Sequence, residues 1–286
     1  MKSTIPALLL FFFSNSISAQ VMSDSILVDG HYRTFHFNKP GSSPGASLIF
    51  ILHGSGGNGK AMMDRTTKLA EKAVAEKILL VYPDGYKRYW NECRKAATSL
   101  ANQENIDENT FFDQMITYFK TKYQINTQRV FAVGTSGGGH MAYKLALTMP
   151  QKFRAITALI ANLPDTDNMD CTEAKIAIPV MIVNGTADQV NPYEGGLVDL
   201  GTVKMGRVRS TDRSLQYWAS LAGYTGEPVK TLLPDTDPSD GKTIERFTYK
   251  QTGKPEIVLL KVIGGKHDYP NDIDVHVEAW EFFKRQ

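Results

Sequence analysis

The chain has 286 residues, 42% of them hydrophobic and 10% aromatic, which is enough for a sizeable core in one large domain or two small ones. Its 32 basic and 30 acidic residues leave a formal net charge of +2, so no broad electrostatic attraction toward nucleic acid or an anionic membrane exists. We therefore expect neither nucleic acid nor a membrane as a partner.

The N-terminus has the pattern of a secretory signal peptide. Lys2 precedes an apolar run over 5–13, and small or polar residues follow it as far as Ala19. The run is too short to span a bilayer, and no later segment approaches about 18 apolar residues. We predict a signal peptide over 1–19, cleavage after Ala19, and a secreted or periplasmic mature protein of one domain over 20–286. A buried N-terminal strand or helix is the alternative.

Predicted strands and helices then alternate along the chain. Edge hairpins are expected over 26–37 and 230–250, and a turn-rich surface loop over 186–206. The predicted core strands are 47–52, 78–82, 130–133, 155–161, 178–183 and 257–263. The predicted helices are 59–77, 107–123, one that begins after 138, 211–222 and 275–283. This alternation predicts an α/β fold with a mostly parallel central sheet and helices on both faces.

The segment 129–147, RVFAVGTSGGGHMAYKLAL, has the pattern G-x-S-x-G between a predicted strand and a predicted helix. Such a strand, sharp turn and helix form the nucleophile elbow of α/β-hydrolases, in which the serine Oγ stands above the sheet. Flanking glycines let the strand and the helix approach closely. We predict Ser136 as the nucleophile. A glycine-rich turn without chemistry is the alternative, because the bare pattern also arises by chance.

A serine hydroxyl needs a base that takes its proton and a carboxylate that orients this base. In α/β-hydrolases the chain order is Ser, acid, His. We predict His267 as the base, because it lies in a glycine-containing turn directly after a core strand. His276 is interpreted as a surface residue of the last helix, and His140 as a packing or surface residue.

The acid must lie between the serine and the histidine at the end of a strand. Asp188 fits, because the strand 178–183 leads into Asn184-Gly185-Thr186-Ala187-Asp188. Asp165, Asp167 and Asp170 follow a strand less directly. We therefore predict Asp188 as the acid, with a satisfied turn aspartate as the alternative.

Two backbone N–H groups are needed to bind the oxyanion that forms in the reaction. Gly137, directly after the nucleophile, supplies the first. For the second we predict the amide of Ser55, in the glycine-rich loop after the strand 47–52, with Gly54 as the alternative. His53 is expected to orient this loop through hydrogen bonds.

Cys93 and Cys171 are the two cysteines of the chain. Because export places them in an oxidising compartment, we predict that they form a disulfide, with two free buried thiols as the alternative. Closing a loop of about 79 residues stabilises the fold by roughly 4 kcal/mol in the chain-entropy model. No His or Cys partner lies at ligand spacing, so a metal site is not expected.

With these residues placed, the chain resembles the secreted esterase family that groups polyhydroxybutyrate depolymerases with feruloyl and acetylxylan esterases of carbohydrate esterase family one. The likeness covers nearly all of the mature chain. It is carried by LHGSGGNGKAM from Leu52, VYPDGY from Val81 with Trp90 and Cys93 after it, GTSGGGHMA from Gly134, NGTADQVNPYEGG from Asn184 and GGKHDYP from Gly264.

The resemblance implies Ser136, Asp188 and His267 as a triad, and secretion to act on esters of plant polysaccharides or on polyesters. The predicted function is thus a secreted serine carboxylic-ester hydrolase that acts on feruloyl or acetyl esters of plant polysaccharide without a cofactor. A polyhydroxyalkanoate depolymerase and a serine peptidase of the same fold are the alternatives within enzymes. A catalytically silent carbohydrate-binding protein is the alternative outside them.

Three positions depart from the pattern of the family. Asn184 stands where the family usually has His, and Asp268-Tyr269-Pro270 stands where Thr-Trp-Pro is common. Ser55 lies at a position where members vary. Asn184-Gly185-Thr186 also matches a glycosylation acceptor, which is the weaker interpretation at the end of a strand. The candidates for stacking on an aromatic acyl group or a sugar, with a place in the core as the alternative for each, are Trp90, Tyr193 and Tyr269.

Overall fold

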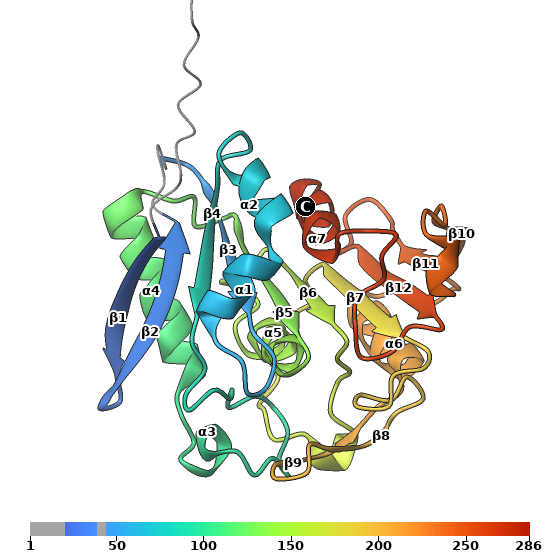
Figure 1. Cartoon of the computed structure of the whole chain (residues 1–286), viewed down its shortest axis with the longest axis horizontal. Helices are drawn as coiled ribbons and strands as arrows, with labels where there is room; N and C mark the ends of the chain where they lie inside the picture. Colours follow the sequence, from blue (N-terminus) through green and yellow to red (C-terminus); the bar gives the residue numbers. More distant parts are fainter. Residues whose placement is uncertain (1–20, 39–43) are drawn as a thin grey trace, which may run out of the picture.

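The computed structural model describes residues 21–38 and 44–286, so the predicted signal peptide lies outside the described residues. A ten-stranded sheet runs through the molecule in the order β1-β2-β4-β3-β5-β6-β7-β12-β11-β10 (Figure 1). Its six central strands are parallel: β4 (Ile78–Pro83), β3 (Ser47–Leu52), β5 (Val130–Thr135), β6 (Ala155–Leu159), β7 (Val180–Gly185) and β12 (Ile257–Ile263).

Antiparallel hairpins form both edges of the sheet. One consists of β1 (Val21–Val28) and β2 (His31–Asn38), and the other of β10 (Val229–Leu232) and β11 (Thr243–Tyr249). Both hairpins lie where the alternation of apolar and polar residues predicts them. The strands β3, β4, β5, β6 and β7 are buried along their whole length, as expected for parallel strands covered on both faces.

Helices cover both faces of this sheet, as predicted (Figure 1). One core lies under α1 (Gly59–Arg65), α2 (Thr67–Ala73) and α7 (Val275–Lys284). The opposite core lies under α4 (Glu108–Tyr123), α5 (Gly137–Thr148) and α6 (Thr211–Leu221). Large aromatic side chains fill both cores, among them Phe112 and Trp218 in the second and Phe283 in the first.

The predicted single helix over 59–77 is wrong, because the helix breaks at Thr66. The buried Thr66 hydroxyl donates to the carbonyl of Met62 at 3.0 Å and shares a hydrogen bond of 2.8 Å with the hydroxyl of Tyr82. Thr66 leaves the helical conformation at φ −119° and ψ 24°. A side chain that bonds nearby groups in this way competes with the helix, and two short helices result.

The predicted surface loop over 186–206 is also corrected. It contains β8 (Gly196–Asp199) and the start of β9 (Lys204–Val208), which pair as a small separate sheet. Val198 and Met205 from these strands are buried in a small cluster with Ala97. Because turn-forming residues are frequent in this segment, its few apolar positions do not produce a recognisable strand pattern.

The remaining short elements are α3 (Leu100–Gln103) and the 3-10 turns η1 (Thr166–Asn168) and η2 (Pro238–Asp240).

The disulfide predicted from the two cysteines is present: Cys93 and Cys171 are bonded, with their Cα atoms 5.0 Å apart. Close by, Arg94 and Met169 form an isolated antiparallel bridge. The disulfide therefore fastens the loop after β4 to the segment after β6. Within 21–38 and 44–286, no helix has both the length and the apolar character needed to cross a membrane.

Candidate active site

Ser136 lies at the sharp turn between β5 and α5. Its backbone has φ 53° and ψ −116°, a conformation that residues with a side chain rarely adopt. A Cβ at Gly134 would overlap the carbonyl of Gly138, and a Cβ at Gly138 would overlap that of Leu52. Only glycine at these two positions therefore lets β5, α5 and β3 meet, and the strained turn raises the Ser136 side chain over the ends of the strands.

His267 and Asp188 complete a hydrogen-bonded chain with Ser136. The Nε2 of His267 lies 3.0 Å from the Oγ of Ser136, and its Nδ1 lies 2.7 Å from the Oδ2 of Asp188. The other carboxylate oxygen of Asp188 accepts 2.8 Å bonds from the amides of Val190 and Asn191. With the Nδ1 proton held by the buried carboxylate, Nε2 is free to accept the proton of the serine hydroxyl.

The amides of Ser55 and Gly137 lie on two backbones that are in contact. A Cβ placed on Gly137 would lie 2.9 Å from the amide nitrogen of Ser55. Within the described part of the chain, neither amide donates to a backbone acceptor outside regular elements or to a side chain. The loop after β3 and the start of α5 thus bring together two unused N–H donors beside Ser136, as an oxyanion site requires.

His53 fixes the shape of this loop. Its Nδ1 bonds the carbonyl of Gly54 at 2.8 Å, and its Nε2 accepts the amide of Gly85 at 2.9 Å. Burial lowers the pKa of the imidazole, which favours the neutral form with the proton on Nδ1. Both ring nitrogens are therefore occupied, in agreement with the orienting role expected for His53.

Trp90 and Tyr193 lie in the core, which corrects their expected place in a substrate cleft. Trp90 is 2% exposed, and its indole N–H donates to the carbonyl of His53 at 2.9 Å. Tyr193 is 3% exposed, and its hydroxyl donates to Asp212 at 2.7 Å. Both aromatic rings are used to hold the loops around the site, and sequence spacing alone does not separate this role from substrate contact.

Tyr269 lies directly beside the nucleophile turn. Its half-buried side chain shares a hydrogen bond with the hydroxyl of Thr135, the residue before Ser136. Burial raises the pKa of the Tyr269 phenol, so the ring stays neutral. Of the three aromatic candidates, Tyr269 is therefore the one that remains next to the site.

Two further histidines are buried. His276 is 2% exposed and packs edge-on against Tyr269, with ring centroids 5.6 Å apart. The interpretation of His276 as a surface residue is wrong, because α7 buries a wider face than the spacing of Val277, Trp280 and Phe283 indicates. His140 is also buried, and burial holds the pKa of its imidazole well below the usual range.

The burial of His276 predicts a stability that depends on pH. Burial lowers the pKa of its imidazole from 6.5 to about 4, so between these values the unfolded chain binds a proton that the folded chain does not. The contribution of His276 to the free energy of unfolding is therefore fully present above pH 6.5 and is lost as the pH falls toward 4. We expect a contribution about 2 kcal/mol lower at pH 5 than at pH 7. Urea unfolding at both values should show a smaller pH dependence for His276→Gln than for the wild type. An equal dependence in both proteins would contradict this assignment.

Asn184, which stands where the resembled family usually has His, is a buried connector. Its Oδ1 accepts the amide of Ala161 at 3.0 Å, and its Nδ2 donates to Asn162 Oδ1 at 2.8 Å and to Thr211 Oγ1 at 2.9 Å. These bonds tie the end of β7 to the segment after β6 and to the start of α6. Because the side chain is buried and fully bonded, glycosylation at Asn184 does not fit the folded chain.

Among the described residues, no group of three or more His, Cys, Asp or Glu side chains is arranged to hold a metal ion.

The chain is similar in sequence to proteins that are named as esterases. "Putative esterase NocK" of Nocardia uniformis subsp. tsuyamanensis is 24% identical over 264 residues, which cover 88% of this chain and 75% of that protein. Feruloyl esterase D of Neurospora crassa is 25% identical over 218 residues, which cover 74% of this chain and 63% of that protein. The chain therefore spans less than two thirds of the length of the Neurospora protein.

Solved structures share the fold at low sequence identity. The acetyl xylan esterase from Aspergillus awamori has a TM-score of 0.62 at 15% identity, over 91% of this chain and 99% of that structure. LpqC, the poly(3-hydroxybutyrate) depolymerase from Bordetella parapertussis, has a TM-score of 0.59 at 18% identity, over 94% and 92%. Residues 36–198, more than half of the chain, match the phospholipase/carboxylesterase family of α/β-hydrolases. This chain belongs to the phospholipase/carboxylesterase family.

Proposed function

We propose that the chain is a secreted serine carboxylic-ester hydrolase that works through an acyl-enzyme. The observation that supports this most directly is the hydrogen-bonded chain from Ser136 Oγ through His267 to Asp188, with distances of 3.0 and 2.7 Å. The strained serine turn and the paired amides of Ser55 and Gly137 support the same chemistry.

In acylation, Ser136 Oγ attacks the ester carbonyl carbon while its proton moves to Nε2 of His267. Asp188 stabilises the imidazolium, and the amides of Gly137 and Ser55 bind the negative charge on the carbonyl oxygen. Collapse of this intermediate breaks the bond to the alcohol, which leaves with the proton from Nε2. A water molecule then attacks the acyl group by the same proton route and releases the acid.

The proposed substrates are feruloyl or acetyl esters of plant polysaccharide, outside the cell or in the periplasm. The names of the feruloyl and acetylxylan esterases among the relatives support this class, and the N-terminal pattern supports export. The structural neighbour from Bordetella favours a polyester as the second candidate. Both proposed substrate classes are tested with the full chain.

A substrate panel tests this proposal. Initial rates are measured on matched feruloyl, acetyl and butyryl esters, on polyhydroxybutyrate and on peptides, and a fluorophosphonate label is mapped by mass spectrometry. We expect acetyl or feruloyl esters to have the highest kcat/KM and the label to lie on Ser136. Faster cleavage of peptides would favour the peptidase, and binding to xylan without labelling of Ser136 would favour the silent binding protein.

A further inference from the structure

A strained basic turn lies beside the proposed oxyanion loop. The amide of Tyr89 donates to the carbonyl of Tyr86 at 3.0 Å, and the two tyrosines form an antiparallel bridge. Between them, Lys87 has φ 48° and Arg88 has φ 72°. Positive φ at both central residues defines a type I′ turn, which normally selects Asn-Gly.

Lys87 and Arg88 are therefore held in a conformation that disfavours them. Strain of this kind collects at functional sites, where the surrounding structure maintains it. Both side chains are exposed, and within the described residues neither lies within salt-bridge distance of a carboxylate. The two cations thus contribute no ion pair that explains their presence in the turn.

The turn is fastened to the proposed catalytic machinery. The carbonyl of Arg88 accepts the amide of Gly56 at 2.9 Å, and Gly56 follows Ser55 in the oxyanion loop. Gly85, just before the turn, donates its amide to the ring of His53. The positions of the Lys87 and Arg88 backbones are therefore set by the same loop that holds the oxyanion donors.

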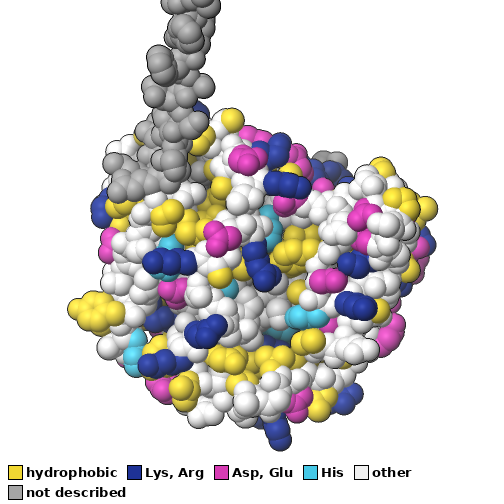
Figure 2. All heavy atoms as spheres, in the orientation of Figure 1, with side chains coloured by type: hydrophobic (Ala, Val, Ile, Leu, Met, Phe, Trp, Pro, Cys, Tyr) yellow, Lys and Arg dark blue, Asp and Glu magenta, His cyan; other side chains and the backbone are white. Residues whose placement is uncertain are grey.

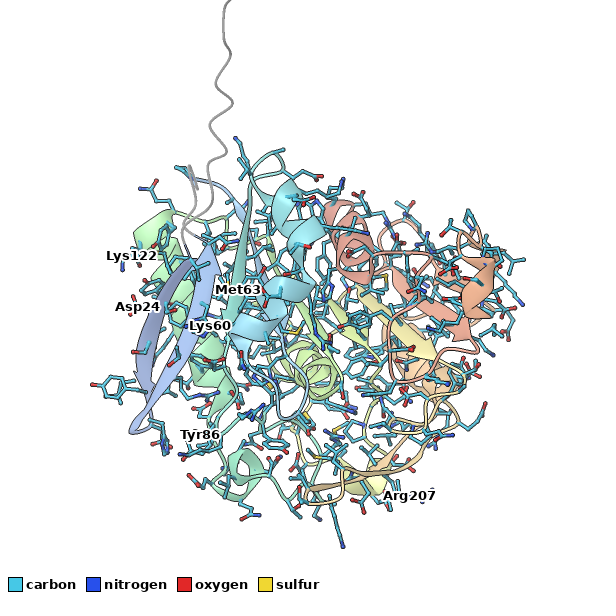
Figure 3. The ribbon with its side chains drawn as sticks, in the orientation of Figure 1. Asp24, Lys60, Met63, Tyr86, Lys122 and Arg207 are labelled. Carbon is cyan, nitrogen blue, oxygen red and sulfur yellow. A yellow bond between two sulfur atoms is a disulfide. The ribbon has the colours of Figure 1, made fainter. Side chains whose placement is uncertain are left out.

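Other cations that form no ion pair within residues 21–38 and 44–286 lie near the site, and together with Lys87 and Arg88 we call them the basic rim. Lys60 and Arg65 are exposed on α1, which follows the oxyanion loop, and Arg65 is close enough to Tyr269 to offset part of the rise in the phenol pKa that burial causes. Lys266 is exposed directly before His267. Figure 2 shows Lys and Arg side chains around the histidines in the middle of the face that Figure 3 shows with Lys60 and Tyr86 labelled. The basic rim is Lys60, Arg65, Lys87, Arg88 and Lys266.

Three carboxylates near the site are already engaged, whereas Asp64 is exposed on α1 between Lys60 and Arg65. Asp84 accepts bonds from the amide of Gly59 and lies 3.0 Å from the ring of His36. Asp268 pairs with Lys242, and Glu104 accepts the hydroxyl of Tyr86. The chain as a whole is nearly neutral, at +2, and Figure 2 shows Asp and Glu side chains on the same face, so the positive charge in question is that of the five basic rim residues and not of the whole face.

We propose that this site takes esters carried by an acidic polysaccharide, whose uronate carboxylates bind to Lys87, Arg88 and the rest of the basic rim. This inference rests on the proposed function and names its substrate class. Exposed cations attract carboxylates weakly and in a salt-dependent way, so they act on the binding of the chain that carries the ester. The ester bond itself is cleaved by the residues already described.

Length-matched acetylated galacturonate oligosaccharides and acetylated xylo-oligosaccharides test the proposal. For the wild type at low salt we expect a lower KM for the acidic series with a similar kcat, and convergence of the two KM values at high salt. Replacing the central residues with the turn's favoured pair, Lys87→Asn/Arg88→Gly, should raise KM for the acidic series about fivefold and leave its kcat in place. The same variant should melt about 3 °C higher, because the turn loses its strain.

A control variant removes two cations at the opposite end of the sheet. Lys77 is also exposed with positive φ, before β4, and Lys120 is exposed near the end of α4. Lys77→Asn/Lys120→Gln should therefore leave both KM values unchanged. A wild type without preference for the acidic series, or an equal rise in KM for the control and turn variants, would overturn the proposal.

Binding provides a readout that does not depend on turnover. Calorimetric titration of Ser136→Ala with oligogalacturonate and with neutral xylo-oligosaccharide should show tighter binding of the acidic chain, and addition of Lys87→Asn/Arg88→Gly should weaken it about fivefold. Absence of turnover on every ester, with this binding preference retained, would reject the proposed hydrolase while supporting the basic rim. Turnover without any acidic preference would do the reverse.

Discussion

Replacing Ser136 with alanine should lower kcat on an unactivated acetyl ester by about 10⁶-fold. The hydroxyl oxygen is the atom that would form the acyl-enzyme, and no other nucleophile lies within hydrogen-bonding distance of His267 Nε2 among the described residues. Rates are compared in the same buffer by release of acetic acid, with enzyme concentrations high enough to resolve the loss.

The loss should not add across the three side chains, because they act as one unit. His267→Ala should cost about as much as Ser136→Ala, and the double variant should be no slower than either. Asp188→Asn should cost about 10⁴-fold, because an amide stabilises the wrong tautomer of His267. Circular dichroism and melting curves of each variant serve as the folding control. If Ser136→Ala kept more than about 1% of kcat, the proposed nucleophile would be wrong.

The sequence predicted the sheet well because its parallel strands are short, apolar runs buried on both faces. The boundaries of β3 and of β12 both agree with their predicted ranges to the residue. The helix break at Thr66 depends on a hydroxyl that bonds Tyr82, 16 residues away. Helical periodicity does not reveal contacts between residues so far apart in the sequence. The pattern alone therefore predicts one helix over 59–77 where the structure has α1 and α2.

The residues of the candidate site also differ in whether a local sequence pattern predicts them. Ser136 has a local signature, because the strained turn needs glycines at fixed positions, and His267 and Asp188 follow strand ends in the expected order. The strain at Lys87 and Arg88 had no such signature, since neither residue type is favoured in a type I′ turn. His276 is buried on the wide buried face of α7 and packs edge-on against Tyr269, a residue outside the helix, so the periodicity of the helix does not predict its burial.

Removing the disulfide with Cys93→Ser/Cys171→Ser should lower the free energy of unfolding by about 4 kcal/mol. The bond joins positions 78 residues apart, so it restricts the unfolded chain strongly. In the folded chain it fastens the segment that contains the buried pair of Arg94 with Glu92, whose side chains are 2% and 1% exposed. Urea unfolding of the oxidised wild type and the double variant measures the difference, provided that both transitions fit two states.

The reduced wild type is the matched control, because it keeps both sulfur atoms and loses only the bond. It should unfold at nearly the same urea concentration as the double serine variant, and well below the oxidised protein. At low temperature, where the variant stays folded, its esterase rate should stay close to that of the wild type. Trp90, three residues before Cys93, still bonds the carbonyl of His53 and so keeps the loop beside the site in place. A difference below about 1 kcal/mol between oxidised and reduced protein would mean that packing around Arg94 and Met169, and not the covalent link, holds this loop in place.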